Sequence, residues 1–262
     1  MSTKKNMNDR RAASRSRRGR RPPVKRSTAV RVPWLALAAV AVVVVLAAGI
    51  VVYALGRDAE VSPFRVSPDN PDPSRNIPGV VSVDYQNQVH VRPTDRVAYD
   101  LSPPFGGPHD GNWAACDGAV YPRPVRSENF VHSLEHGAVW IAYDPQRVTG
   151  APLDQLRQRV SGQTYLALSP YPGLDRAVSL QAWGRQLKLD DPADPRLEQF
   201  VRALRQNPNT HPEVGASCGA LGPDSFDPTN PPPFDPSPPG ADAVPMNAPA
   251  RDQSPVPDTG GR

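Results

Sequence analysis

An uncharged apolar run occupies residues 34–55 and reads WLALAAVAVVVVLAAGIVVYAL. At a rise of about 1.5 Å per residue, a helix of this length covers the roughly 30 Å hydrocarbon core of a bilayer. Trp34 and Tyr53 stand near its two ends, where amphipathic aromatic rings favour the membrane interface. The buried helices of soluble proteins rarely run this long without a polar face. We therefore predict one transmembrane helix.

Charge is distributed very unevenly around this run. Residues 1–32 contain twelve Lys or Arg and one acid, whereas residues 58–262 contain 17 Lys or Arg and 25 Asp or Glu. The positive-inside rule places residues 1–33 in the cytoplasm as a basic tail and the rest of the chain outside it, anchored at the cell membrane by a single pass. A cleaved signal peptide would have shorter basic and apolar segments and a small-residue cleavage site, so we expect a retained signal anchor.

The basic tail does not indicate nucleic-acid binding, because no aromatic residue interleaves with its arginines. We expect it to fix topology and to contact anionic lipid. Beyond the span, residues 56–79 are predicted to be a stalk and residues 80–220 one folded extracytoplasmic domain. Residues 221–262 contain twelve prolines and few large apolar side chains. That composition predicts a disordered, extended tail.

Periodicity within the domain predicts alternating strands and helices. Short apolar runs ended by proline or turn residues indicate strands, and apolar residues at i, i+3 and i+7 indicate helices. The expected strands are 138–143, 164–169 and 177–183, and the expected helices are 153–160 and 197–204. A first strand or hairpin edge is expected within 81–91, and a Pro/Gly-rich loop at 102–109. This order predicts an α+β fold with a small, largely antiparallel sheet and helices on one face.

The chain contains two cysteines, Cys116 and Cys218. Both follow the span, and a pair of thiols outside the cytoplasm most simply forms a disulfide. The alternative for Cys116 is a role as a soft metal ligand.

Histidines are concentrated in one segment, and two of the five belong to the sequence HSLEHG at 132–137. Ser127 suits a helix N-cap and Gly137 a helix stop, so residues 128–136 are predicted to form a short helix. On it, Phe130, Val131 and Leu134 would share one face, and the opposite face would carry His132, Glu135 and His136. Imidazoles at i and i+4 can bind one metal ion. The same histidines could instead cap the carbonyl end of the helix.

The pattern H-x-x-E-H also occurs in a class of zinc metallopeptidases, in which the glutamate is the base. Those enzymes need a further acidic ligand, for which Glu198 or Glu213 is available. The expected helix is short and the domain small, so this alternative ranks third.

Five stretches resemble an actinobacterial, membrane-anchored family known as domain of unknown function 3105. They are 90–109 (HVRPTDRVAYDLSPPFGGPH), Trp113 with Cys116 and Tyr121, 128–145 (ENFVHSLEHGAVWIAYDP), 169–175 (SPYPGLD) and 180–204 (LQAWGRQLKLDDPADPRLEQFVRAL). The resemblance implies a single-pass extracytoplasmic protein without an established activity. It also implies histidines at the positions of His90, His109, His132 and His136.

Two hypotheses of function follow. In the first, His109, His132 and His136 hold a transition metal, copper or zinc, with His90 or Glu135 as a further ligand. Binding would then weaken as the pH falls through about 6.5. In the second, the domain is a structural or interaction module of the cell envelope without a metal. A hydrolase using Glu135 is the third possibility, and we expect that the chain is not an enzyme. The sequence identifies no protein partner.

Overall fold

The computed structural model describes residues 34–86, 88–222 and 225–249. The apolar run lies in helix α1 (Trp34–Val61). Within the described part of the chain, one helix is long and apolar enough to cross a membrane, at residues 34–56 with a mean hydropathy of 3.1. This helix suggests membrane anchoring. The expected basic tail lies outside the described residues, and a second compact unit begins at Tyr53.

A six-stranded mixed sheet forms the centre of this unit. Its strand order is β1 (Val81–Ser82), β9 (Arg185–Leu189), β8 (Val178–Ala182), β6 (Val139–Tyr143), β7 (Leu166–Pro170), β5 (Asp117–Val120). The neighbours from β1 to β6 are antiparallel, whereas β6–β7 and β7–β5 are parallel. The predicted α+β class with a mostly antiparallel sheet is confirmed.

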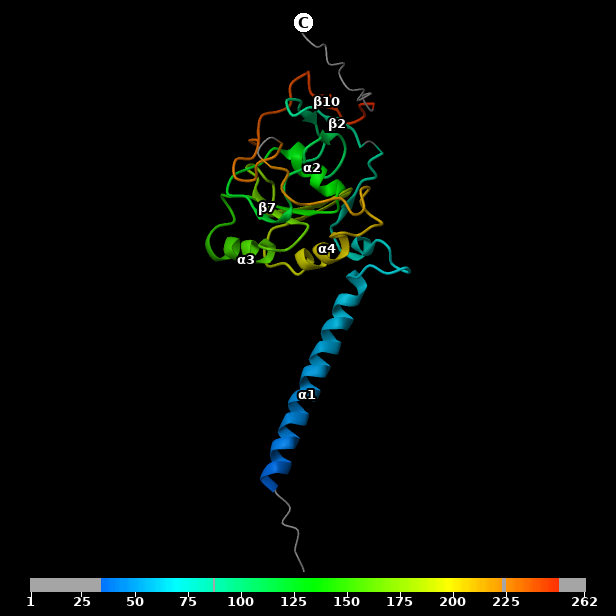
Figure 1. Cartoon of the computed structure of the whole chain (residues 1–262), viewed down its shortest axis with the longest axis vertical. Helices are drawn as coiled ribbons and strands as arrows, with labels where there is room; N and C mark the ends of the chain where they lie inside the picture. Colours follow the sequence, from blue (N-terminus) through cyan, green and yellow to red (C-terminus); the bar gives the residue numbers. More distant parts are fainter. Residues whose placement is uncertain (1–33, 87, 223–224, 250–262) are drawn as a thin grey trace, which may run out of the picture. The chain divides into compact units, whose positions relative to one another are not determined.

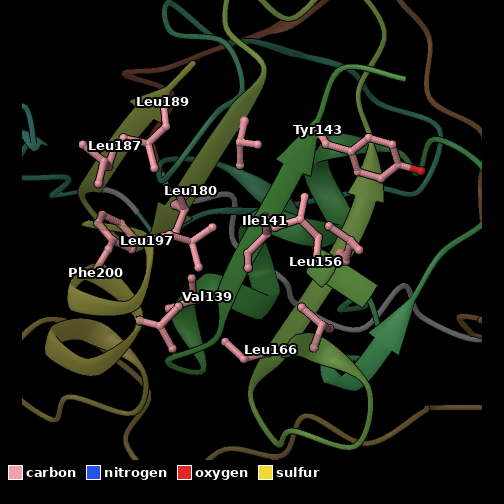
Figure 2. Close-up of a cluster of buried hydrophobic side chains, with 14 of the residues drawn as sticks. Val139, Ile141, Tyr143, Leu156, Leu166, Leu180, Leu187, Leu189, Leu197 and Phe200 are labelled. Atoms are coloured by element: carbon pink, nitrogen blue, oxygen red, sulfur yellow. The ribbon is translucent and has the colours of Figure 1, made fainter. Parts of the chain in front are cut away.

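Helices cover both faces of this sheet. Helices α3 (Gly150–Val160) and α4 (Arg196–Leu204) pack on one face, and α2 (Ser127–Glu135) packs on the other (Figure 1). The sequence predicts helices on one face only, whereas the structure has helices on both. Strand β6 is therefore buried on both of its sides. Val139, Ile141 and Tyr143 belong to the core cluster that also contains Leu156, Leu197 and Phe200, and Figure 2 draws these side chains together. Trp140 and Ala142 pack in the second core with α2.

Strands β1 and β2 (His90–Val91) lie within the first strand or hairpin edge expected at 81–91, whereas several other elements were not predicted. Strand β9 reads RQLKL and lacks an apolar run, yet three of its five residues are buried. Two parallel pairs lie outside the main sheet: β2 with β4 (His109–Asp110), and β3 (Val97–Ala98) with β10 (Val244–Pro245). The short 3-10 helices η1 (Ser62–Phe64) and η2 (Pro73–Asn76) lie in the expected stalk.

The folded unit extends beyond the expected boundaries of 80 and 220. In the expected stalk, Ile77 is buried in the core and Asp72 forms an ion pair with Arg185 at 2.7 Å. In the expected tail, Phe226 is fully buried and Val244 pairs with Val97. A few well-placed large side chains therefore fix segments whose overall composition indicated disorder. Residues 250–262 lie outside the described part.

The predicted disulfide is present between Cys116 and Cys218, with Cα atoms 4.8 Å apart across a sequence separation of 102. That Cα separation lies in the normal range for disulfides. The backbone N–H of Cys116 also donates to the carbonyl of Cys218 at 2.8 Å. The bridge thus fixes the segment after α4 beside the loop before β5, and it removes Cys116 as a metal ligand.

Candidate metal centre

Helix α2 separates an apolar face from a polar one, as its sequence predicts. Phe130, Val131 and Leu134 are fully buried in the second core, and the opposite face carries His132, Glu135 and, just past the helix end, His136. Gly137 follows with φ of +90°, and a Cβ there would lie 2.7 Å from Nε2 of His211. Only glycine fits this turn without strain. The helix therefore ends with Gly137 packed against the ring of His211.

Strands β2 and β4 supply two more histidines. Their register places His90 opposite His109 in a parallel pair, so the two imidazoles project from neighbouring strands on the same side. The ring centroids of His90, His109 and His132 are each 4.9 Å from the other two. Residues far apart in sequence thus meet above the polar face of α2.

The inner cluster consists of His90, His109, His132 and Glu135. One ligand atom from each lies within 4.8 Å of the others. Oε2 of Glu135 is 2.7 Å from Nε2 of His109 and 3.9 Å from Nε2 of His90. His109, His132 and Glu135 are buried, whereas the His90 side chain keeps 35% of its exposure.

Main-chain carbonyls orient the rings of this cluster. Nδ1 of His109 donates to the Gly107 carbonyl at 2.8 Å, and Nδ1 of His132 donates to the Asp110 carbonyl at 2.6 Å. In this tautomer the Nε2 atom carries a lone pair, which is the state that binds a metal.

Two acceptor atoms, Nε2 of His109 and Oε2 of Glu135, consequently face each other. Nε2 of His109 and Oε1 of Glu135 have no hydrogen-bond partner among the described residues. The 2.7 Å approach of Glu135 Oε2 to the same nitrogen lacks hydrogen-bond geometry. Unpaired buried acceptors are costly, and two lone pairs at this separation repel each other. A proton or a metal cation between them removes the repulsion.

The outer cluster consists of His132, His136 and Glu213, and it shares His132 with the inner cluster. Its ligand atoms also lie within 4.8 Å of one another, and Nε2 of His136 is 3.1 Å from Oε2 of Glu213. The Trp113 ring packs edge-on against His132 and His136, with centroid distances of 5.6 and 4.8 Å. Glu213 keeps 45% side-chain exposure, so this cluster reaches solvent.

Burial favours the neutral form of His132 and His90. Desolvation, together with the nearby His109, lowers the pKa of His132 to about 3. Desolvation is also the largest cause of the lowered pKa of His90, and His109 adds to it. The imidazole of His132 is therefore available as a neutral ligand well below neutral pH.

The structure brings together four of the five predicted site residues and places the fifth, His136, in the adjoining outer cluster. The sequence indicates Glu213 only as a possible acidic ligand of a peptidase, alongside Glu198. Its backbone N–H donates to the Glu135 carbonyl at 3.1 Å, whereas Glu198 pairs with Arg202 on α4. No sequence signal places Glu213 here, because its position depends on the loop that follows α4.

His211, the remaining histidine, belongs to neither cluster. Its Nδ1 donates to the Glu135 carbonyl at 3.1 Å. This bond supports the end of α2 rather than supplying a ligand.

A family model described as "Protein of unknown function (DUF3105)" matches residues 90–220. No curated protein and no solved structure matches the chain. The matched range contains every residue of the inner and outer clusters and both cysteines.

Proposed function

The chain belongs to the DUF3105 family, whose description states no activity, and from the chemistry of its inner cluster we propose that it binds a transition-metal ion. The domain would be a metal-binding module held at the membrane by α1, with copper or zinc as its ion. His90, His109, His132 and Glu135 would be the ligands.

The observation that carries this proposal is the contact between Nε2 of His109 and Oε2 of Glu135. The His109 nitrogen is buried and unpaired, the Glu135 side chain is 2% exposed, and the two acceptor atoms lie 2.7 Å apart without hydrogen-bond geometry. A cation bound by both would convert this repulsion into attraction. Two more imidazoles from separate elements point at the same place, which a single proton would not require.

The donor set favours Cu(II) or Zn(II). Three imidazoles and a carboxylate suit these ions, and the disulfide leaves neither cysteine available as a thiolate ligand. Four ligands about 2.0–2.1 Å from a tetrahedral ion lie roughly 3.3–3.4 Å from one another. The widest pair, within 4.8 Å at present, would therefore approach by up to about 1.5 Å, and the 2.7 Å pair of His109 and Glu135 would separate by roughly 0.6 Å.

The disulfide and the charge asymmetry support an extracytoplasmic location for the domain. A disulfide persists in an oxidising compartment. The basic residues before α1 favour a cytoplasmic N-terminus, with α1 as an uncleaved signal anchor.

A hydrolase is a weaker candidate, although Glu213 supplies the acidic ligand that the H-x-x-E-H pattern calls for. In such an enzyme Glu135 would act as the base on a metal-bound water. Here one oxygen of Glu135 lies against His109, and its carboxylate is almost fully buried. This position fits a ligand better than a base that meets a substrate.

Metal analysis of the full chain in detergent tests the proposal. We expect about one copper or zinc ion per chain, lost in His132→Ala and kept in His211→Gln, the matched histidine control. At an ion concentration of about 100 times Kd, the bound ion should stabilise the folded state by about 2.7 kcal/mol. If neither copper nor zinc binds, and neither raises the melting temperature, the domain is a metal-free structural or interaction module instead.

A further inference from the structure

His136 and Glu213 remain outside the inner cluster, yet His136 is oriented in the same way as the inner histidines. Its Nδ1 donates to the Ser217 carbonyl at 2.6 Å, which leaves Nε2 as the lone-pair nitrogen. That nitrogen faces the Glu213 carboxylate at 3.1 Å. The arrangement repeats the imidazole–carboxylate contact of the inner cluster, but at a position that solvent reaches.

His132 belongs to both clusters and can serve only one at a time. Its Nδ1 is occupied by the Asp110 carbonyl, so a single nitrogen is free for a metal. Two ions therefore cannot use His132 together. The inner and outer clusters are alternative positions for one ion, not the two halves of a dinuclear centre.

Each cluster reaches solvent through one side chain, Glu213 (45% exposed) in the outer cluster and His90 (35% exposed) in the inner one. The carboxylate is exposed only in the outer cluster, because Glu135 is almost completely buried. A hydrated ion loses water stepwise as protein ligands replace it. The half-exposed carboxylate of Glu213 can meet such an ion before its remaining water is lost, because exposed charges raise association rates.

We propose that His132, His136 and Glu213 form an outer metal position, which takes up hydrated Zn²⁺ or Cu²⁺ and passes it to the inner cluster. The ion stays bound to His132 during transfer. His136 and Glu213 leave while His90, His109 and Glu135 replace them, with no change in oxidation state. The transfer step rests on the proposed function of the inner cluster, whereas the outer position does not.

The surrounding chain holds the outer position in place. Glu213 donates its backbone N–H to the Glu135 carbonyl at 3.1 Å, and the segment that supplies the Ser217 carbonyl ends at the disulfide-bonded Cys218. His136 lies directly after α2. The two outer ligands are therefore anchored to the same helix that carries His132.

Loading kinetics test the transfer. Full-length protein in detergent is freed of metal and mixed with Zn²⁺, and intrinsic Trp fluorescence follows binding, since Trp113 packs on both His132 and His136. Glu213→Gln should slow loading about tenfold and should slow release to a chelator as well, because both directions use the outer position. Glu198→Gln, which removes a surface carboxylate on α4, is the matched control and should load like the wild type.

A second variant tests the outer position by itself. His109→Asn keeps a side-chain group that can donate to the Gly107 carbonyl and removes the inner nitrogen. We expect it to bind Zn²⁺ about 10–100-fold more weakly, through the outer position. Adding Glu213→Gln should then abolish the remaining binding, while circular dichroism shows that both variants are folded.

The outcomes separate the two proposals. Wild-type loading and release rates in Glu213→Gln, or residual binding that the added Glu213→Gln does not change, would overturn the outer position and leave the inner cluster standing. Absence of Zn²⁺ and Cu²⁺ binding in the wild type would overturn the inner cluster and the transfer together.

Discussion

At the scale of single residues, the candidate site depends on which ring nitrogen each histidine leaves free. Main-chain carbonyls take Nδ1 of His109, His132 and His136, and the remaining nitrogens point into the two clusters. Histidines that only capped the helix would use these nitrogens on backbone carbonyls and point apart. In each of these rings, one nitrogen donates to a carbonyl and fixes the orientation of the ring. The other nitrogen remains available to bind a metal ion.

This division predicts different behaviour for two substitutions of His132. His132→Asn can keep the hydrogen bond to the Asp110 carbonyl while removing the ligand nitrogen, whereas His132→Ala loses both. We expect neither variant to bind the ion, and Ala to be less stable than Asn by about 1–3 kcal/mol because a buried carbonyl loses its donor. Urea unfolding without metal measures the stability difference. Ion binding by the Asn variant would show that His132 is not a ligand.

The lowered pKa of His132 predicts how the ion-free protein responds to acid. Between about pH 3 and 6.5 the unfolded chain binds a proton at His132 that the folded chain does not. The free energy of unfolding therefore decreases as the pH is lowered through this range. The loss is about 1.4 kcal/mol per pH unit for this residue. His90 and His211 act in the same direction, since their pKa values are also lowered.

Urea unfolding at pH 7 and pH 5 checks this acid sensitivity, with His132→Asn as the comparison. The variant should lose about 2 kcal/mol less than the wild type over this range. Equal losses would mean that His132 is protonated in the folded state as readily as in the unfolded chain. The same shift moves the expected loss of metal binding from about pH 6.5 to a lower pH.

At the scale of secondary-structure elements, the spacing of apolar residues predicted the strands and helices whose buried faces it defines. Strands β6, β7 and β8 and helices α2, α3 and α4 all follow their periodicity. Strand β9 was not predicted, because Arg185, Gln186 and Lys188 interrupt its apolar pattern. Its position depends instead on the hairpin that it forms with β8. The site was half predictable for the same reason. Helical spacing joins His132, Glu135 and His136, but only tertiary packing brings His90 and Glu213 to them.

The C-terminal segment shows how composition can mislead at this scale. Its proline content indicated disorder, yet Phe226 is fully buried and lies edge-on to Tyr121, with ring centroids 6.2 Å apart. Arg96 pairs with Asp235 at 3.0 Å and also donates to the carbonyls of Asp235 and Ser237. A few anchors thus offset the ordering entropy of a segment that has little regular structure.

We predict that Phe226→Ala destabilises the domain by about 3–5 kcal/mol, as expected for a large buried aromatic side chain. Phe234→Ala, in the same segment but only partly buried, should cost less. Chemical denaturation of the two variants measures both effects, and limited proteolysis should show cleavage within 225–249 first in Phe226→Ala. Stability equal to the wild type in Phe226→Ala would mean that the segment does not pack on the domain in solution.

At the scale of the whole molecule, the apolar helix and the disulfide make a joint prediction. Helix α1 has the length and hydropathy of a membrane span, and the Cys116–Cys218 bridge needs an oxidising compartment. The basic segment before the span should remain on the cytoplasmic side, because translocating that many positive charges is unfavourable. A domain on the outer side of the membrane would bind metal ions from a compartment whose ion concentrations the cytoplasm does not control.

This orientation is testable without knowing the function. Protease added to intact cells stripped of their wall should digest the domain, while an epitope tag placed before residue 34 should stay protected until the membrane is opened. Thiol labelling of the denatured, unreduced protein should find neither cysteine free, because the pair is bonded. A protected domain with labelled cysteines would reverse the topology. The ion would then have to come from the cytoplasmic pool, and the half-exposed Glu213 would face that compartment instead.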